Sequence, residues 1–333
     1  MMRLAIDAMG GDHAPQETVR GAVEALSAVE ADIVLIGDEA AIGEELKKYT
    51  YDGGRLHVIH APERITNEEK PVQAIKTKKQ SSLVVGLELL RKGELDALIS
   101  AGNTGALLAG GALKVGRIKG IDRPALTTVY PTEKGIAVLV DAGANTMCIP
   151  RNLAEFATMG SIYAQEVLGI ENPRVGLVNV GSEEGKGNSL VSEAYDLLKT
   201  LPLNFIGNLE ARDIPAGAAD VIVCDGFTGN VILKLSEGYA RTFSRFLQDL
   251  FGRSQLTKVA ALLVMGGLKD FKKRMDYREY GGAPLLGTVR PVVKAHGSSN
   301  ARAFMNAFRY AEKYAANGVI EKIQAQVGAA EQE

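Results

Sequence analysis

Short apolar runs alternate with longer helical patterns along the whole of this 333-residue chain. The runs are apolar at nearly every position, as expected of strands that are buried on both faces of a sheet. This alternation predicts parallel βαβ units with helices on both faces of the sheet. We expect strands at residues 3–6, 32–36, 56–60, 97–100, 127–130, 136–140, 175–179, 204–207 and 221–224, and helices at residues 14–29, 40–48, 71–92, 152–168, 187–201, 229–251 and 300–317.

The length suits either two domains or one large α/β domain. No low-complexity segment separates two halves, so we expect a single α/β domain over residues 1–333 with two interwoven lobes. The formal net charge is −2, and no run of like charges forms a basic arm. This charge balance argues against nucleic acid as a partner.

The two cysteines, Cys148 and Cys224, lie far apart in the sequence and form no metal-ligand spacing, which is typical of a reducing cytoplasm. Cys224 ends an apolar run and is expected to be a core thiol. We expect neither a metal site nor a catalytic cysteine. The apolar N-terminus meets Asp7 too soon for a secretory signal. No run reaches the roughly 18 apolar residues that a membrane-spanning helix needs.

Five of the apolar runs end in a small polar residue followed closely by glycine. In an open α/β sheet, ligands bind outside the carboxyl ends of the strands. Glycines at such ends let the backbone approach a ligand closely. We therefore predict one cleft lined by short polar side chains and bare backbone. The stretches are IDAMGGDH (6–13), ISAGNTG (99–105), LVDAGAN (139–145), LVNVGSEEGKGN (177–188) and VCDGFTGN (223–230).

The last of these stretches resembles a phosphate cradle in its chemistry. A loop that opens a helix presents free N–H groups and the positive end of the helix dipole, and both favour an anion. Thr228 and Asn230 would add hydrogen-bond partners beside Asp225. The alternative is a tight turn from strand to helix in which Thr228 or Asn230 is the N-cap.

Lys186 lies in a second glycine-rich loop, GSEEGKGN (181–188), that opens a predicted helix. The glycine spacing is one residue short of a Walker loop and no Ser or Thr follows the lysine, so we reject an ATP site. The lysine is well placed to meet phosphate, and the alternative is a solvated loop residue. No G-x-G-x-x-G sequence follows a strand, so the usual dinucleotide fingerprint is absent.

Two of the four histidines flank glycine-rich turns. His13 and His296 could each donate a proton or bind an anion, although a lone loop histidine more often forms a structural hydrogen bond. His57 and His60 flank a strand and are interpreted as structural.

The segment 256–268 is an apolar helical pattern of about ten residues that we expect to end at Gly266 and Gly267. It is too short to span a bilayer. It could be a buried helical hairpin or a dimer contact, and its basic flank would also suit an anionic membrane surface or an acidic partner. The apolar face includes Leu256, Val259, Leu262 and Leu263, and the basic flank comprises Lys258, Lys269, Lys272, Lys273 and Arg274.

Eight motifs, spread in order over the whole chain, together resemble the bacterial phosphate acyltransferase family of phospholipid synthesis. They are IDAMGGDHAP (6–15), SAGNTGA (100–106), GRIKGIDRPA (116–125), NVGSEEGKGN (179–188), NFIGNLEARD (204–213), CDGFTGNVILK (224–234), YGGAPLLG (280–287) and KAHGSSN (294–300).

The resemblance implies transfer of a fatty acyl group from acyl carrier protein to inorganic phosphate, without a cofactor. The product, acyl phosphate, would feed a membrane glycerol-3-phosphate acyltransferase. The implied fold is a Rossmann-like α/β/α sandwich of the isocitrate and isopropylmalate dehydrogenase type, with a mostly parallel sheet. The resemblance also implies a cytoplasmic homodimer bound peripherally to the inner face of the cell membrane. Residues 235–275 would then be a projecting helical hairpin for dimer and membrane contact.

In that reaction phosphate is itself the nucleophile, so no catalytic serine or cysteine is required. The enzyme must align phosphate with the thioester carbonyl, stabilise the oxyanion and let a thiolate leave. Asp225 or His296 could supply the proton to sulfur. The candidate catalytic residues are Lys186, Asn188, Asp225, Asn230 and His296. The candidate substrate-binding residues are Asp7, Gly10, Gly11, Asp12, His13, Gly102, Asn103, Thr104, Gly105, Gly226, Thr228 and Gly229.

Three alternatives remain open at this stage. A short-chain phosphate acetyltransferase that uses coenzyme A would share the fold and the chemistry. A decarboxylating dehydrogenase would share the fold, but we find neither its set of metal-binding aspartates nor a nicotinamide site. A non-catalytic membrane scaffold would have no reason to keep five polar, glycine-rich strand ends.

Overall fold

The computed structural model describes residues 1–275 and 281–330, and the side chains of residues 1–268 and 281–327. In this part of the chain, eleven strands form one mixed sheet in the order β3-β2-β1-β4-β11-β10-β5-β6-β9-β7-β8. The strands are β1 (Arg3–Asp7), β2 (Asp32–Gly37), β3 (Leu56–His60), β4 (Ala97–Ser100), β5 (Ala125–Thr132), β6 (Gly135–Val140), β7 (Val175–Asn179), β8 (Phe205–Glu210), β9 (Val221–Val223), β10 (Ala283–Leu286) and β11 (Val292–Lys294).

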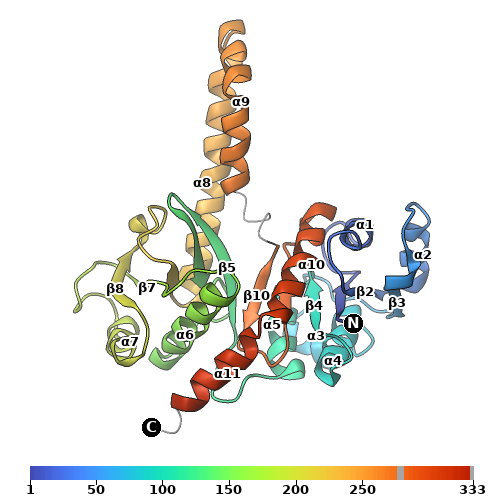
Figure 1. Ribbon diagram of the computed structural model, residues 1–333, viewed down its shortest axis with the longest axis horizontal. Coiled ribbons are helices and arrows are strands. Elements are labelled where there is room, and N and C mark those ends of the chain that lie inside the picture. Colours follow the sequence, from blue (N-terminus) through green and yellow to red (C-terminus); the bar gives the residue numbers. More distant parts are fainter. Residues whose placement is uncertain (276–280, 331–333) are drawn as a thin grey trace.

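Helices pack around this sheet, and one pair of helices leaves it (Figure 1). The α-helices are α1 (Gln16–Ala25), α2 (Glu39–Leu46), α3 (Pro71–Thr77), α4 (Ser82–Lys92), α5 (Thr104–Gly110), α6 (Pro150–Glu166), α7 (Ser189–Thr200), α8 (Gly226–Gly252), α9 (Gln255–Met275), α10 (Ala301–Ala316) and α11 (Val319–Ala330). A π-helix, η2 (Gly111–Val115), continues α5, and two short 3-10 turns are η1 (Gly53–Arg55) and η3 (Ala211–Asp213).

The predicted alternation of strands and helices is confirmed, with three differences. The helix expected at residues 71–92 is two helices, because Ser81 accepts a hydrogen bond from Val84 N and begins α4 as its N-cap. Strands β10 and β11, and helices α5 and α11, were not expected. The two missed strands have only four and three residues, too few to show a period.

The chain crosses the sheet twice. It builds β1 to β4 in one half, then β5 to β9 in the other, and returns to place β11 beside β4 (Figure 1). The pairings of β11 with β10, β10 with β5 and β5 with β6 are antiparallel, and the others are parallel. Three reversals of direction therefore lie between β4 and β6. The parallel strands of the two halves run in opposite senses along the sheet.

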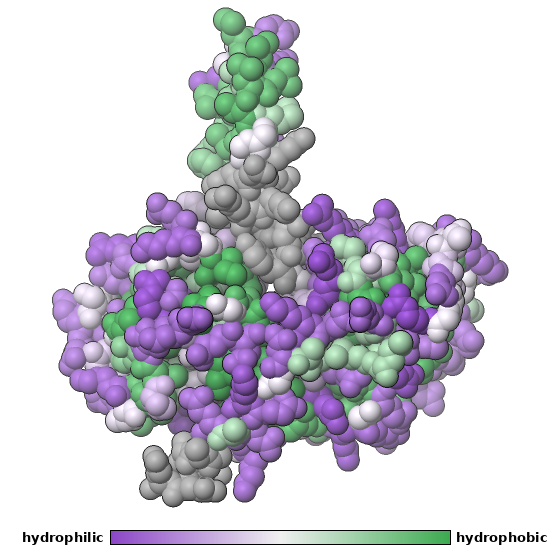
Figure 2. All heavy atoms as spheres, viewed as in Figure 1, coloured by the Kyte–Doolittle hydropathy of each residue, from purple (hydrophilic) through white to green (hydrophobic). Residues whose placement is uncertain are grey.

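Helices α8 and α9 form an antiparallel hairpin that projects from the body of the molecule (Figure 1). The expected helix end at Gly266 and Gly267 is wrong, because α9 continues through both glycines to Met275. A buried hairpin is also contradicted within this chain, since the apolar side chains of α9 are exposed. Leu256 and Leu263 are each 83% exposed. Figure 2 shows these apolar residues gathered toward the free end of the hairpin.

Among the described residues, no helix combines the length and the apolar character that crossing a membrane requires.

Candidate functional site

The first turn of α8 packs directly on the end of β6, and this contact explains the two glycines of VCDGFTGN. A Cβ atom at Gly229 would overlap the carbonyl oxygen of Asp141, and one at Gly226 would lie 2.7 Å from the backbone nitrogen of Asn145. Gly226 N also donates to Asn145 O over 2.7 Å. These glycines therefore allow a close approach between two parts of the chain.

The N-cap of α8 is Asp225. The alternative of a tight turn is therefore correct, but the capping residue is neither Thr228 nor Asn230. Its Oδ1 accepts from Phe227 N at 2.9 Å and from Thr228 N at 3.0 Å. Its Oδ2 accepts from the Thr228 hydroxyl at 2.7 Å. The carboxylate thus satisfies amides that a helix N-terminus would otherwise offer to an anion. The loop is a capped turn in this structure, so the backbone alone does not make a phosphate cradle here.

Asp141, which the sequence analysis did not select, organises the turn beneath α8. Its Oδ1 accepts from Leu126 N, Gly143 N and Ala144 N, and its Oδ2 accepts from both Asn145 N and Asn145 Nδ2. Burial raises the pKa of this carboxyl, and the backbone hydrogen bonds oppose that rise. Asp141 is therefore saturated with donors from its own turn and from β5.

Four of the predicted catalytic residues, Asp225 among them, lie at neighbouring strand ends, because β9 is paired with both β6 and β7. Asn230 is half-buried on α8, close to Gly143, and its side-chain amide makes no hydrogen bond within the described part of the chain. Lys186 is exposed and lies 4.0 Å from a carboxylate oxygen of Glu183. Asn188 is the N-cap of α7, where its Oδ1 accepts from Val191 N. We name this set, with Asp141 and Asp225, the β6–β9–β7 group.

A second group of polar residues lies at the ends of β1, β4 and β11. Asp7 is buried, and it accepts hydrogen bonds from Ser82 Oγ at 2.6 Å and Ser100 Oγ at 2.7 Å. Burial raises the pKa of Asp7 above its usual value. A Cβ at Gly10 would lie 2.5 Å from Asp7 Oδ2 and 2.8 Å from Gly102 N. The first and fourth strands thus meet through glycine backbone. We name this set the β1–β4–β11 group.

Lys294 belongs to the same group, and the sequence analysis missed it. Its Nζ donates to Gly102 O at 3.0 Å and to Ala295 O at 2.6 Å. Burial lowers the pKa of this amine to about 8, while Asp7 and Asp12 act in the opposite direction. A lysine placed directly at the end of a strand, in VVKAHG, was the available signal. Perturbed amines of this kind occur often at functional sites.

The remaining predicted residues of this group lie in the loops that follow β1 and β11. Asp12 N donates to Gly297 O at 2.8 Å, which joins the first loop to the loop that follows β11. His296 shares a hydrogen bond of 2.9 Å between its Nδ1 and Ser298 Oγ. His13 is exposed just before α1. Gly11 has φ of +114°, a conformation that favours glycine.

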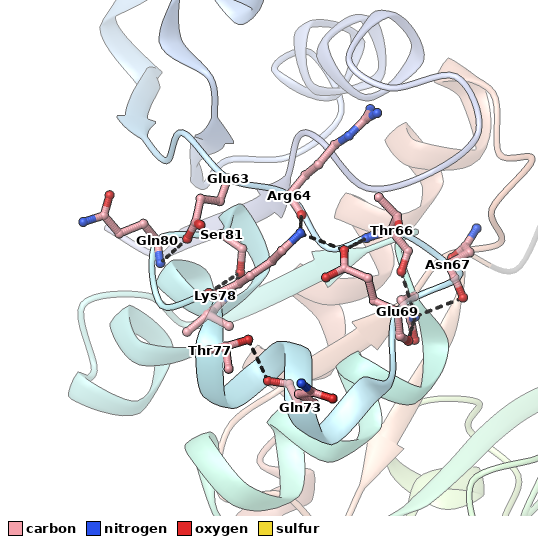
Figure 3. Close-up of polar contacts among 12 residues, drawn as sticks. Glu63, Arg64, Thr66, Asn67, Glu69, Gln73, Thr77, Lys78, Gln80 and Ser81 are labelled. Atoms are coloured by element: carbon pink, nitrogen blue, oxygen red, sulfur yellow. Dashed lines mark hydrogen bonds and ion pairs between the residues drawn. The ribbon is translucent and has the colours of Figure 1, made fainter.

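Asn103 is a structural residue in this structure. Its Oδ1 caps α5 by accepting from Ala106 N, and its Nδ2 donates to Thr66 O at 2.9 Å. The loop that it holds is fastened further by Lys78, whose Nζ donates to Glu69 Oε1 and to Arg64 O (Figure 3). Thr104 begins α5, and a Cβ at Gly105 would press on Pro71. The loop therefore packs against one side of the first turn of α5, while Thr104 stays exposed.

The structure brings the predicted residues together in two groups, where one cleft was expected. Strands β10 and β5 lie between the strands of the two groups, and none of the hydrogen bonds described above joins one group to the other. Helix α5 connects the two regions: Asn103 is its N-cap, and Leu108 packs against the apolar cores of both halves.

Both cysteines have the features expected of unreactive thiols. Cys224 is buried, as predicted, and its pKa is raised well above the ordinary value. Burial raises the pKa of Cys148 to about 11. No cluster of three or more metal-ligating side chains occurs among the residues that the structure describes.

The apolar face predicted on α9 is exposed on the hairpin, where Val259 and Leu262 lie beside Leu256 and Leu263. Of the predicted basic flank, only Lys258 has a described side chain. The side chains of Lys269, Lys272, Lys273 and Arg274 lie outside the described residues.

Comparison with known proteins assigns the chain to a family. Residues 2–322 match the family model described as "Fatty acid synthesis protein". A protein of Alkaliphilus oremlandii named phosphate acyltransferase is 60% identical over 322 residues, covering 97% of this chain and 96% of that protein. Another of that name, from Thermoanaerobacterium thermosaccharolyticum, is 53% identical over 326 residues, covering 98% and 97%.

Solved structures share the fold at much lower identity. A phosphotransacetylase from Streptococcus pyogenes superimposes with a TM-score of 0.65 at 17% identity, over 94% of both chains. A 4-hydroxythreonine-4-phosphate dehydrogenase from Klebsiella pneumoniae gives a TM-score of 0.54 at 14% identity, over 94% of this chain and 99% of that one. The structural likeness shows a common α/β fold, and the sequence match shows that this chain belongs to the fatty acid synthesis protein family, alongside relatives named phosphate acyltransferase.

Proposed function

We propose that this chain transfers a fatty acyl group from acyl carrier protein to inorganic phosphate and so supplies acyl phosphate for phospholipid synthesis. The observation that carries the proposal is the match, at up to 60% identity over nearly the full chain, to proteins named phosphate acyltransferase. The chain is an acyltransferase on this basis. The fold is compatible with the proposal, because a phosphotransacetylase shares it.

The reaction needs positioning and charge stabilisation more than a protein nucleophile. A phosphate oxygen attacks the thioester carbonyl carbon, and the C–S bond breaks as the tetrahedral oxyanion collapses. The electron pair leaves on sulfur, which then takes a proton. Groups that hold phosphate and stabilise the oxyanion therefore supply most of the rate enhancement.

The β6–β9–β7 group supplies the donors that we assign to phosphate. Asn230 has an amide that no described residue engages, and Lys186 offers a cation that its glutamate holds only weakly. Asn188 keeps its Nδ2 available because only its Oδ1 is used by the α7 cap. Asp225 is engaged by its own helix, so we assign it to positioning and retain His296 as the candidate proton donor to sulfur. His296 lies in the β1–β4–β11 group, so this role requires the acyl donor to reach both groups.

The finer features of the proposal follow the family. We propose the isopropylmalate dehydrogenase type of α/β/α sandwich, with two interwoven lobes, and a cytoplasmic homodimer. The exposed apolar face of α9, with Leu256 and Leu263, would touch the membrane surface peripherally. A membrane glycerol-3-phosphate acyltransferase would take up the product.

The direct test measures acyl phosphate formed by the purified protein from palmitoyl-acyl carrier protein and inorganic phosphate, with palmitoyl-coenzyme A and acetyl-coenzyme A in parallel. Phosphate-dependent loss of the carrier-protein thioester is the expected result. Activity with acetyl-coenzyme A alone would favour the second candidate, a short-chain phosphate acetyltransferase, which the fold likeness to a phosphotransacetylase makes worth testing.

Lys186→Ala tests the phosphate assignment. Loss of one charged donor is worth about 1.5–3 kcal/mol, so the KM for phosphate should rise about 10- to 100-fold while the KM for the acyl donor changes little. Lys199→Ala is the matched control, because Lys199 is also an exposed lysine beside a glutamate, at 3.5 Å from Glu184. Equal effects of Lys186→Ala on both substrates would contradict the assignment.

A further inference from the structure

A pocket on the surface lies next to the β6–β9–β7 group, in a part of the chain that the proposed mechanism does not use. It has a volume of about 370 Å³ and is lined by Arg117, Gly120, Ile121, Asp122, Ile149 and Arg151. Arg123 extends this lining, because its Nε lies 3.7 Å from Asp122 Oδ2, and Lys119 is exposed next to Gly120. We call Arg117, Lys119, Arg123 and Arg151 the basic patch.

The four cations of this patch are only partly paired with carboxylates. Arg117 and Arg123 share one carboxylate, that of Asp122, at 3.6 and 3.7 Å, which is beyond hydrogen-bond distance. Two of the arginines make hydrogen bonds. Arg117 donates to the carbonyl oxygen of Asp122, and Arg151 donates to Gly120 O at 3.0 Å and to Oε1 of the buried Glu155 at 2.8 Å. Each guanidinium has five N–H donors in a fork that fits carboxylates. An acidic partner would therefore find several unused donors, although the whole chain has a net charge of −2.

Two large apolar side chains stand beside these cations. Met147 is 81% exposed and Ile149 is 55% exposed, and Ile149 also lines the pocket. Protein interfaces typically bury an apolar centre inside a charged rim. A free monomer gains nothing from exposing both side chains next to a pocket. The combination therefore fits a protein surface better than it fits a free anion.

The patch is connected to the candidate site by direct contacts. Asn145 Nδ2 donates to Pro124 O at 2.8 Å, next to Arg123, and Asn145 O accepts from Gly226 N at the start of α8. Met147 and Ile149 follow Asn145 in the same segment. A partner seated on the patch would lie at the edge of the β6–β9–β7 group.

We propose that the basic patch, with Met147 and Ile149, is the docking surface for the acidic helical face of the acyl carrier protein that delivers the thioester. This inference rests on the proposed function for the identity of the donor. Charge complementarity selects the carrier protein, because its surface is acidic and the patch is cationic. The docked carrier would present its thioester arm toward Asn230.

The test is the double variant Lys119→Glu/Arg123→Glu. These two cations make no short hydrogen bond through their side chains within the described residues, so reversing them should leave the fold intact. Arg151 stays unchanged because it pairs with the buried Glu155. We expect the Kd for fluorescently labelled acyl carrier protein to rise at least tenfold and to lose most of its dependence on salt. The KM for the carrier thioester should rise in parallel, with kcat and the KM for phosphate within twofold of wild type.

The control is Lys47→Glu/Arg212→Glu, which changes net charge by the same amount at the two ends of the sheet. Both side chains are more than two-thirds exposed. Equal weakening of carrier-protein binding by both double variants would overturn the proposal. So would the absence of binding by the wild-type protein. A change of sedimentation coefficient in the patch variant alone would overturn it too, by making the patch a contact between copies. Binding lost by the patch variant, in a wild type that binds the carrier without turnover, would support docking and contradict the proposed function.

Discussion

Two buried aspartates, Asp7 at the end of β1 and Asp141 directly after β6, stand in similar sequences, IDAMGG and VDAGAN, yet their surroundings differ. Asp141 accepts five hydrogen bonds, four of them from backbone N–H groups. Asp7 accepts from two serine hydroxyls of other elements, and its charge acts on the amine of the half-buried Lys294. One carboxylate fixes a turn, and the other belongs to a network that can titrate.

The difference teaches that a polar strand end is not in itself a ligand site. In the β6–β9–β7 group, Asp141 and Asp225 accept hydrogen bonds from their own turns, so the side chains that can bind a substrate are the asparagine amides and an exposed lysine. In the β1–β4–β11 group, charge is held near glycine backbone and can change with pH. Variants at the two sites should therefore fail in different ways.

The largest expected effect is that of Gly229→Ala, in the β6–β9–β7 group. The new methyl group would overlap the Asp141 carbonyl oxygen, which is backbone and has no freedom to yield, so α8 must move. We expect a loss of about 3 kcal/mol or more in the free energy of unfolding, measured by urea denaturation.

Gly238→Ala is the control on the same helix. An added Cβ at Gly238 meets nothing within 4 Å, so the better helix propensity of alanine should stabilise by up to about 1 kcal/mol. Similar effects of the two variants would show that α8 does not depend on the close approach at Asp141.

Much of the fold could be predicted from the sequence, because continuous apolar runs leave few alternatives to buried parallel strands. The edge strands β3 and β8 were also found, although their burial is only partial. Strands β10 and β11 are short and are bounded by glycine and proline, so their apolar residues resembled loop positions. Helix α5 was hidden by its glycines, although Asn103 before TGALL is an N-cap signal.

The site was predicted less completely, since the sequence shows which residues end strands but not which ends are neighbours. Three antiparallel pairings reverse the direction of the parallel strands in the second half of the sheet, and no local sequence pattern predicts these pairings. Asp225 was expected to contact a ligand because helix caps and phosphate loops use the same small polar residues, and the structure shows it as the N-cap of α8. Lys294 was passed over because burial of its amine is a property of the packed structure.

A smaller effect is expected at Lys294, and it depends on pH. Its pKa in the folded protein is about 8, against 10.5 for an ordinary lysine, so the unfolded chain binds more protons between these values. Stability must then rise with pH from 8 to 10.5, by about 3 kcal/mol at most. Below pH 8 the cost of burying the charged amine is fully present. Lys294→Met should abolish this rise in unfolding free energy, whereas Lys186→Met should keep it. A rise of the same size in all three proteins would show that another group titrates.

The smallest effects are expected for the two aspartate-to-asparagine substitutions, which compare the two carboxylates directly. Asp141→Asn replaces one acceptor oxygen by an NH₂ group that faces fixed backbone donors, so it should cost about 2 kcal/mol. Asp7→Asn faces the hydroxyls of Ser82 and Ser100, which can rotate to accept, and it should cost less. It should also lower the pKa of Lys294 further, because the Asp7 charge raises that pKa. The pH at which stability begins to rise should therefore move down in Asp7→Asn and stay in place in Asp141→Asn. If that pH is unchanged in both variants, the charge of Asp7 does not affect the pKa of Lys294. Each aspartate would then act only as a hydrogen-bond acceptor for its turn, and the two strand ends would be equivalent.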